Sequence, residues 1–277
     1  MNAGQLAEMA ARLCGERSGG NYVPDDAAIT HDAAGLRMFD APIVGVASAG
    51  DEYFTEFRQK NIIGEHFATP GEWLRSARSV VSMFFPKTAR VKDSCASSLK
   101  WPSAEWLHAR IEGQAFINET MERAKAAIEA EGYEAVIPSQ DRRFFSVSAK
   151  ARDELPGVNF SSSWSERHVA FVCGLGTFGL SKGLITRSGV AGRFGSIVTS
   201  LDLPPTPRGY DGVYDWCTMC GACARNCPAN AISPDEGKNH FPCSAFLDET
   251  RKRFAPRYGC GKCQVKVPCQ DHPPSIA

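Results

Sequence analysis

A short run of cysteines near the C-terminal end has the spacing of an iron–sulfur ligand set. Cys217, Cys220, Cys223 and Cys227 stand in the order C-x2-C-x2-C-x3-C, and Pro228 follows directly. In proteins with two cubane clusters, the first three thiolates of such a run bind one cluster and the fourth binds the other. The run therefore predicts a redox-active metal centre and a second set of cysteines.

That second set is present further along the chain. Its members are Cys243, Cys260, Cys263 and Cys269. If the last cysteine of each run binds the cluster of the other run, there are two ligand groups. The first group is then Cys217, Cys220, Cys223 and Cys269, and the second group is Cys227, Cys243, Cys260 and Cys263. The second half departs from the bacterial ferredoxin repeat, since Pro268 precedes its last cysteine. We therefore predict eight ligands for two 4Fe-4S clusters, and treat their division into groups as a hypothesis.

Two other uses of these cysteines are disfavoured. A zinc ribbon could be built from the pairs Cys220/Cys223 and Cys260/Cys263, but zinc needs four ligands and would leave the other thiolates idle. A disulfide scaffold suits short secreted chains, whereas this chain is long and has ample apolar residues for a core. The remaining cysteines, Cys14, Cys95 and Cys173, are interpreted as core thiols.

Composition places the chain among ordinary soluble proteins. Of 277 residues, 43% are apolar and 22% are charged, and equal numbers of basic and acidic residues give a formal net charge of zero. This neutrality disfavours nucleic acid as the main partner. No apolar run reaches membrane-spanning length, and the first twenty residues lack an export signal, so we expect no membrane association and a cytoplasmic location.

Hydrophobic patterns and turn residues predict a mixed order of helices and strands. The expected helices are 3–14, 103–132 and 165–174, and the expected strands are 42–47, 80–85, 133–137, 184–186 and 194–203. This order favours an α+β fold over a doubly wound sheet. A proline-rich linker, 203–210, then separates a large domain (1–205) from the cysteine-rich module (206–277).

A glycine-rich segment resembles a dinucleotide fingerprint but stands in the wrong context. Gly174, Gly176 and Gly179 match G-x-G-x-x-G, yet a predicted helix precedes them where the fingerprint needs a strand. The glycines could instead allow close approach of a flat ligand, or could simply reverse the chain.

Several segments together resemble the epoxyqueuosine reductase and reductive dehalogenase superfamily. They are GEHFATPGEWL (64–74), SVVSMFFP (79–86), WSERHVA (164–170), GLGTFGLSK (174–182), GRFGSIV (192–198) and the cysteine module with its isolated Cys243. The likeness covers roughly residues 36 to 270. It implies a nitroreductase-like core that holds cobalamin, followed by a ferredoxin-like module with two 4Fe-4S clusters that supplies electrons.

The chain also departs from the queuosine enzymes. Those enzymes use an Asp shortly before the Glu-Arg pair as a proton donor, whereas 159–165 contains no carboxylate here. They also continue past the ferredoxin module, while this chain stops soon after Cys269. With the neutral charge, these differences predict that epoxyqueuosine in tRNA is not the substrate.

Candidate site residues follow from the motifs and the resemblance. The candidate catalytic residues are Asp141, Arg142, Glu166 and Tyr210. The candidate cofactor-binding residues are Ser163, Arg167, Gly174, Leu175, Gly176, Thr177, Phe178, Gly179 and Lys182.

These residues predict an iron–sulfur oxidoreductase that passes electrons through two clusters to cobalamin and reduces a small molecule or a corrinoid on a partner. An external donor such as ferredoxin or flavodoxin would supply the electrons. Two alternatives stay open. One is an electron-transfer protein that reduces a partner's cofactor, and the other is an FMN-dependent reductase on the same core.

Overall fold

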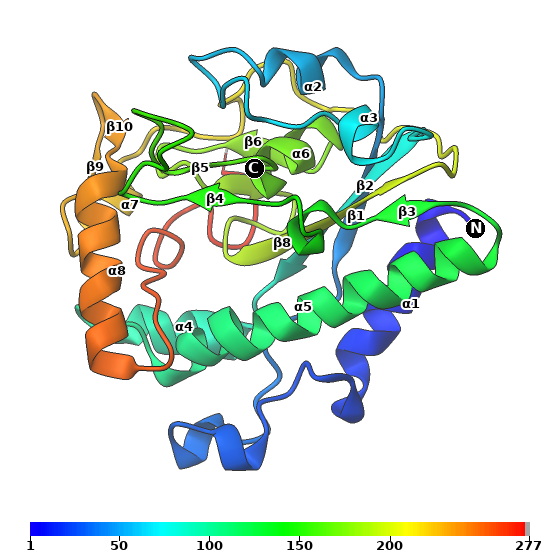
Figure 1. Cartoon of the computed structure of the whole chain (residues 1–277). Coiled ribbons are helices and arrows are strands. Elements are labelled where there is room, and N and C mark those ends of the chain that lie inside the picture. The colour runs from blue at the N-terminus through cyan, green and yellow to red at the C-terminus, as the bar shows by residue number, and fades with distance from the viewer. Residues whose placement is uncertain (275–277) are drawn as a thin grey trace.

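The computed structural model describes residues 1–274, and its centre is a four-stranded antiparallel sheet (Figure 1). The strand order is β1-β2-β8-β3, and every neighbouring pair is antiparallel. The strands are β1 (Ile43–Ser48), β2 (Ser79–Pro86), β3 (Ala135–Val136) and β8 (Gly192–Thr199). Helices surround this antiparallel sheet, as expected for an α+β fold.

Strand β2 lies inside the sheet because both of its faces are apolar. Val81, Met83 and Phe85 belong to one core cluster, while Val80 and Phe84 belong to the cluster on the opposite face. All eight residues of β2 are buried. A strand covered on both faces reads as a continuous apolar run, which is why this segment was recognisable in the sequence.

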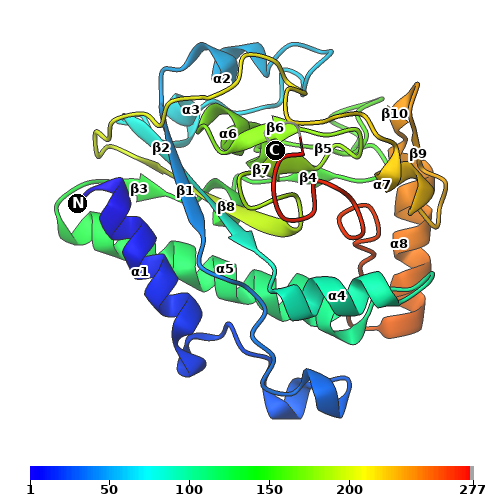
Figure 2. The same cartoon turned by 180° about the vertical axis from the view of Figure 1, so that it is seen from behind.

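Two helices cover one face of the sheet (Figure 2). They are α1 (Ala3–Gly15) and the long helix α5 (Ala104–Ala130), which packs against β8. The Ser103 side chain accepts a hydrogen bond from the amide of Trp106 and caps α5, as its sequence position predicted. Gly195 on β8 admits Met121 of α5, since a Cβ there would lie 2.9 Å from the Met121 side chain.

The other face is covered by α6 (Glu166–Val172) and by a hairpin of β6 (Gly176–Phe178) and β7 (Leu184–Thr186). Beside them, the rings of Phe67, Trp164 and Phe54 form a stack, with interplanar angles of 7° and 12°. Ser165 precedes α6 without capping it, because its hydroxyl meets His168 Nδ1 at 2.7 Å.

The remaining elements are short, apart from the last helix. They are α2 (Glu52–Glu56), α3 (Pro70–Trp73), α4 (Ala89–Ser97), β4 (Ser146–Val147), β5 (Ser161–Ser162), α7 (Ala222–Arg225), β9 (Ile232–Ser233), β10 (Gly237–Lys238), α8 (His240–Phe254), and 3-10 turns at Arg17–Gly19, Asp25–Ala27, His31–Ala33 and Pro138–Gln140. Within residues 1–274, no helix is both long enough and apolar enough to cross a bilayer.

The proline-rich segment 203–210 runs beside the sheet. Thr206 exchanges hydrogen bonds with Val46 of β1 through its amide and its hydroxyl, at 2.9 and 3.0 Å. The Leu203 amide donates to Ser79 Oγ at 2.9 Å. These bonds fix where the cysteine-rich part of the chain begins.

The glycines of the G-x-G-x-x-G segment serve the packing of the chain on itself. A Cβ on Gly176 would lie 1.9 Å from the carbonyl oxygen of Ile185, across the β6–β7 hairpin. At Gly174, which has a φ of +78°, a Cβ would lie 3.1 Å from Thr206. At Gly174 and Gly176, neighbouring parts of the chain therefore occupy the space into which a side chain would point.

We predict that Gly176→Val destabilises the fold by more than about 4 kcal/mol, because backbone atoms cannot yield to the new side chain. Thermal unfolding of the purified variant measures this. Gly209→Val is the matched control, since no atom lies within 4 Å of a Cβ there. An unchanged unfolding midpoint for Gly176→Val would contradict the packing argument.

Candidate functional site

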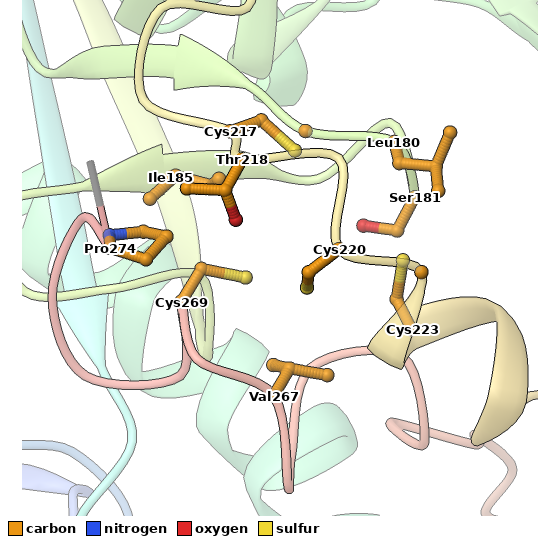
Figure 3. A pocket seen from close by; sticks show the side chains of 12 residues that line it. Leu180, Ser181, Ile185, Cys217, Thr218, Cys220, Cys223, Val267, Cys269 and Pro274 are labelled. Atoms are coloured by element: carbon orange, nitrogen blue, oxygen red, sulfur yellow. The ribbon is translucent and has the colours of Figure 1, made fainter. Parts of the chain in front are cut away.

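Four cysteines surround one small cavity (Figure 3). Cys217, Cys220, Cys223 and Cys269 line it together with Gly179, and their sulfur atoms face a shared space. They are the members of the first predicted ligand group. Cys269 reaches them from the far end of the module, where its carbonyl accepts a hydrogen bond from the Val190 amide at 2.9 Å.

The loop that carries the first three cysteines depends on two left-handed residues. Met219 has a φ of +51° and Gly221 a φ of +71°, so the chain curls around the cavity before α7 begins. The hydroxyl of Thr177 accepts a hydrogen bond from the Trp216 amide at 2.9 Å and ties the loop to β6. Thr177 therefore positions this loop.

The second predicted group gathers at the start of α8 and in the segment after it. Cys243 and Cys227 both raise the pKa of Cys263, and Cys263 and Cys243 both raise the pKa of Cys260, after burial as the main cause. The Cys227 sulfur accepts a hydrogen bond from the Ala231 amide at 3.3 Å. These four thiols are thus close enough to act on one another electrostatically.

The two cysteine groups adjoin. Burial raises the pKa of Cys223 to about 11, and Cys263 of the other group is the next contributor. Within the described range 1–274, no three Cys, His, Asp or Glu side chains converge closely enough for a single metal ion. A zinc ribbon would need four ligands about 2.3 Å from one ion.

A larger, aromatic cleft of about 790 Å³ lies beside the second group. We call it the aromatic cleft. Its ring-bearing lining residues are Tyr53, Phe57, Phe160, His168, Phe171, Phe178, Tyr214, His240 and Phe241, and its cationic lining residues are Arg167, Lys182 and Lys238. Flat apolar walls with a few charged groups are typical of cofactor sites.

Two half-buried histidines of the aromatic cleft have lowered pKa values. Burial lowers the pKa of His168 to about 4, and Arg167 and Lys182 lower it further. Burial likewise lowers the pKa of His240 to about 4, with Lys238 as the next cause. The imidazole of His240 stacks on Phe160 at 5.4 Å. At neutral pH these rings therefore extend the aromatic wall without adding charge.

A second cavity, of about 530 Å³, adjoins the cleft between α5, α6 and β8. We call it the arginine cavity, because Arg110, Arg167 and Arg193 line it. Arg167 and Ser165 line both spaces. The pKa of Arg167 is lowered by burial and by Arg110, while Cys263 and Cys243 raise it, so this side chain stands between the cavities and the second cysteine group.

Glu166 brings a carboxyl group into the arginine cavity. Both of its oxygens are buried without a hydrogen-bond partner among the described residues. Burial raises the pKa of Glu166 to about 7, although the nearby hydroxyls of Ser196 and Ser139 lower it somewhat. Glu166 is thus poised to hold a proton near neutral pH.

The predicted site residues fall into two sets. Arg167, Phe178 and Lys182 line the aromatic cleft, Glu166 lines the arginine cavity, and Gly179 lines the first cysteine cavity. The others line none of these three cavities. They are Asp141, Arg142, Ser163, Gly174, Leu175, Gly176, Thr177 and Tyr210.

Local bonds explain why several of these residues lie elsewhere. The Tyr210 hydroxyl donates to the Phe171 carbonyl and accepts from the Gly176 amide, and burial raises its pKa. Asp141 is held by Arg143, which lowers its pKa to about 2. Ser163 accepts a hydrogen bond from the Phe145 amide at 3.1 Å. These side chains stabilise the surrounding loops.

Other lining residues carried no signal in the sequence. Arg110 lies within α5, where an arginine reads as a surface residue, and Arg193 begins β8. Phe160 has a φ of +52°, and with His240 it closes the cleft from a separate loop. Only the tertiary fold brings these positions together. The leftover thiols Cys14, Cys95 and Cys173 are buried, which confirms their interpretation as core residues.

Comparison with known proteins supports the cluster site and the fold. Residues 212–233 match the model of the 4Fe-4S binding domain. No curated protein matches the chain. This segment is therefore an iron–sulfur domain, and it contains the first four cysteines of the ligand run.

Solved structures with a similar fold include an epoxyqueuosine reductase with an epoxyqueuosine-modified tRNA-Tyr stem loop. Its sequence identity to this chain is 17%, and its TM-score is 0.51. The match covers 100% of this chain and 71% of that chain. A catabolic reductive dehalogenase in complex with 3-bromo-4-hydroxybenzoic acid has 18% sequence identity and a TM-score of 0.51. The match covers 97% of this chain and 36% of the dehalogenase chain. The epoxyqueuosine reductase from Streptococcus thermophilus has 19% sequence identity and a TM-score of 0.48. The match covers 85% of this chain and 66% of that enzyme.

The chain thus spans 66% of the length of the Streptococcus thermophilus enzyme and 36% of the dehalogenase. At these identities the likeness concerns the fold. The chain has the fold shared by epoxyqueuosine reductases and reductive dehalogenases, joined to a 4Fe-4S binding domain.

Proposed function

We propose that this protein is a reductase that passes electrons through two 4Fe-4S clusters to cobalamin and acts on a small molecule. The nitroreductase-like core would be residues 1–205 and the cluster module residues 206–277, of which 275–277 lie outside the described residues. The observation that carries the proposal is an uninterrupted series of neighbouring sites, from the first cysteine group through the second to the aromatic cleft.

Each junction in this series rests on named side chains. Cys263 of the second group raises the pKa of Cys223 of the first group, so the two groups are neighbours. Cys263 and Cys243 in turn raise the pKa of Arg167, which lines the aromatic cleft. Electrons that enter at the first cluster would therefore reach the cleft through the second.

The entry point is the first group, because its edge is open to solvent. Cys220 is exposed, and Met219 beside it is 44% exposed. An external donor such as a ferredoxin or flavodoxin could approach a cluster here without any rearrangement of the chain.

The residues of the cleft suit a large macrocycle with polar side arms. Aromatic walls from α2, α6 and the 157–160 loop can cover the faces of a flat ring, while Arg167, Lys182 and Lys238 can meet carbonyl and phosphate oxygens at its edge. The adjoining arginine cavity adds the room that such a cofactor or its substrate needs. Cobalamin, when bound, supplies a strongly reducing metal centre.

Protons for a reduction must come from groups around these two spaces. Tyr53 and Tyr214 line the cleft with hydroxyl groups, and Glu166 holds a proton in the arginine cavity near neutral pH. We propose that Glu166 replaces the carboxylate that 159–165 lacks. The acceptor would be a small molecule or a corrinoid on a partner, with no role for tRNA.

The crossed cluster assignment can be tested with two substitutions. We expect about eight irons and eight sulfides per chain in anaerobically purified protein. Cys269→Ser should abolish the electron paramagnetic resonance signal of the first cluster, and Cys227→Ser that of the second. Cys95→Ser, a buried cysteine outside both groups, should keep both signals. Loss of the same signal in both ligand variants would reject the crossed assignment.

Glu166 should make stability depend on pH. Its pKa is about 7 in the folded protein against 4.5 as the ordinary value, so it favours the folded state fully below pH 4.5. That contribution falls by on the order of 3 kcal/mol as the pH rises to about 7. Unfolding midpoints of the wild type and Glu166→Gln should therefore diverge between these pH values, with the variant more stable at pH 8.

The control for this experiment is Glu122→Gln, on the exposed face of α5. It should follow the wild type at every pH. Parallel pH profiles for the wild type and Glu166→Gln would show that Glu166 titrates normally, and would remove it as a proton source.

The proposed function itself is tested by the cofactor content. Anaerobic purification in the presence of hydroxocobalamin should yield about one cobalt per chain together with the clusters. Reduction through the clusters should then change the absorption of the bound cobalamin. Flavin bands in place of cobalt would favour the FMN-dependent alternative, and clusters alone would favour an electron-transfer protein.

A further inference from the structure

The arginine cavity is lined by three arginines and, among its described lining residues, by one carboxyl group, that of Glu166. Arg110, Arg167 and Arg193 line it, and within residues 1–274 no carboxylate forms an ion pair with any of them. Arg167 is exposed, and Arg110 and Arg193 are half-buried, so these cations can be reached from solvent. A group of arginines without ion pairs can therefore receive a ligand of opposite charge.

The cations act on one another at close range. Arg110 and Arg167 both lower the pKa of Arg193, to about 9, after burial as the main cause. Lys87 lies behind them and is fully buried, and the charges of Arg193 and Arg110 lower its pKa after burial as the main cause. The Lys87 ammonium lies 4.5 Å from the centre of the Trp106 ring, and no described carboxylate pairs with it. The positive potential therefore comes from residues on α5, α6 and β8 and from Lys87, which follows β2.

The iron–sulfur clusters do not account for this whole charge. Cys263 and Cys243 raise the pKa of Arg167, so a cluster there would pair with that arginine. No cysteine contributes to the pKa shift of Arg193, and Tyr258 is the residue that raises the pKa of Arg193. Arg193 is therefore free to meet an anion from outside the chain.

The cavity also offers hydrogen-bonding groups that lack partners. Gln264 lines it, and the Oε1 position of that side chain is buried without a hydrogen bond, as are both carboxyl oxygens of Glu166. Arg193 donates to Gln114 Oε1 through Nε at 2.7 Å and through Nη2, which fixes its plane and leaves Nη1 unbonded among the described residues. A planar fork held in this way is preorganised for a carboxylate or phosphate.

We infer that the arginine cavity binds the oxyanionic group of a small molecule, with Arg110 and Arg193 as its principal partners. Two sources share this chemistry: the carboxylate of a free substrate, and the phosphate of a nucleotide-bearing corrinoid. The apolar part of the ligand would lie against Trp164 and Phe194, which line the same cavity. This inference narrows the substrate class of the proposed reductase, but the binding itself requires no turnover.

The test uses anaerobically purified protein that retains its clusters and has no added cobalamin. Isothermal titration calorimetry would compare benzoate and inorganic phosphate with benzamide, the neutral counterpart of benzoate. We expect benzoate or phosphate to bind at least tenfold more tightly than benzamide, as for about one charge-assisted hydrogen bond. Equal binding of benzoate and benzamide, with no phosphate binding, would overturn the inference.

Substitutions locate the site. Arg193→Gln should weaken oxyanion binding about tenfold or more, and Arg110→Gln serves the same purpose if the first variant does not fold. Arg123→Gln is the matched control, since this α5 residue is 51% exposed and pairs with Glu119 outside the cavity. Oxyanion binding that is unchanged in both Arg193→Gln and Arg110→Gln would also overturn the inference.

A competition experiment separates the two sources. If hydroxocobalamin displaces benzoate, the cavity holds the phosphate of the corrinoid. If both bind together, it holds a separate anionic substrate. Either result supports an oxyanion site. Failure to bind cobalamin would count against the proposed cofactor. The calorimetric comparison of benzoate with benzamide would still test the oxyanion site, because it uses no cobalamin.

Discussion

The arrangement of the metal site depends on how the C-terminal segment returns to the core. The Cys269 carbonyl accepts a hydrogen bond from Val190, and at Gly189 a Cβ would lie 2.0 Å from the Gln270 carbonyl oxygen, so the two segments are in direct contact. A buried lysine, Lys262, donates to the Cys95 carbonyl at 2.6 Å and ties the same segment to α4. Without this docking, Cys269 would not meet the three cysteines of the first loop.

The return of this segment also explains the order of the sites. Cys243 lies on α8 and Cys263 on the segment after it; Cys263 acts on Cys223 of the first group, and both act on Arg167 of the two cavities. The sheet and α5 provide a rigid support, and the cavities open where α6 and the β6–β7 hairpin meet them. A redox protein needs such closely spaced sites, since each centre must lie near the next.

The charge distribution complements this geometry. Overall the chain is neutral, yet three arginines line one cavity and Lys87 lies behind them. Glu166 is the carboxyl group that enters this cavity in the described part of the chain, and burial favours its protonated form. The formal net charge of zero therefore does not show that positive side chains cluster at one site.

The sequence by itself determined the cluster chemistry and the strands of the central sheet, whereas α8 was not predicted. The spacing of Cys217, Cys220, Cys223 and Cys227 specifies a cubane ligand run, and continuous apolar patterning marked β2, because both signals are local. The tertiary structure decided what the glycine segment does and which residues line the cavities. The clash that forbids a side chain at Gly176 comes from Ile185 across a hairpin. Likewise, Arg110 and Arg193 share a cavity only because α5 packs on β8, and contacts between distant segments leave no periodic trace in the chain.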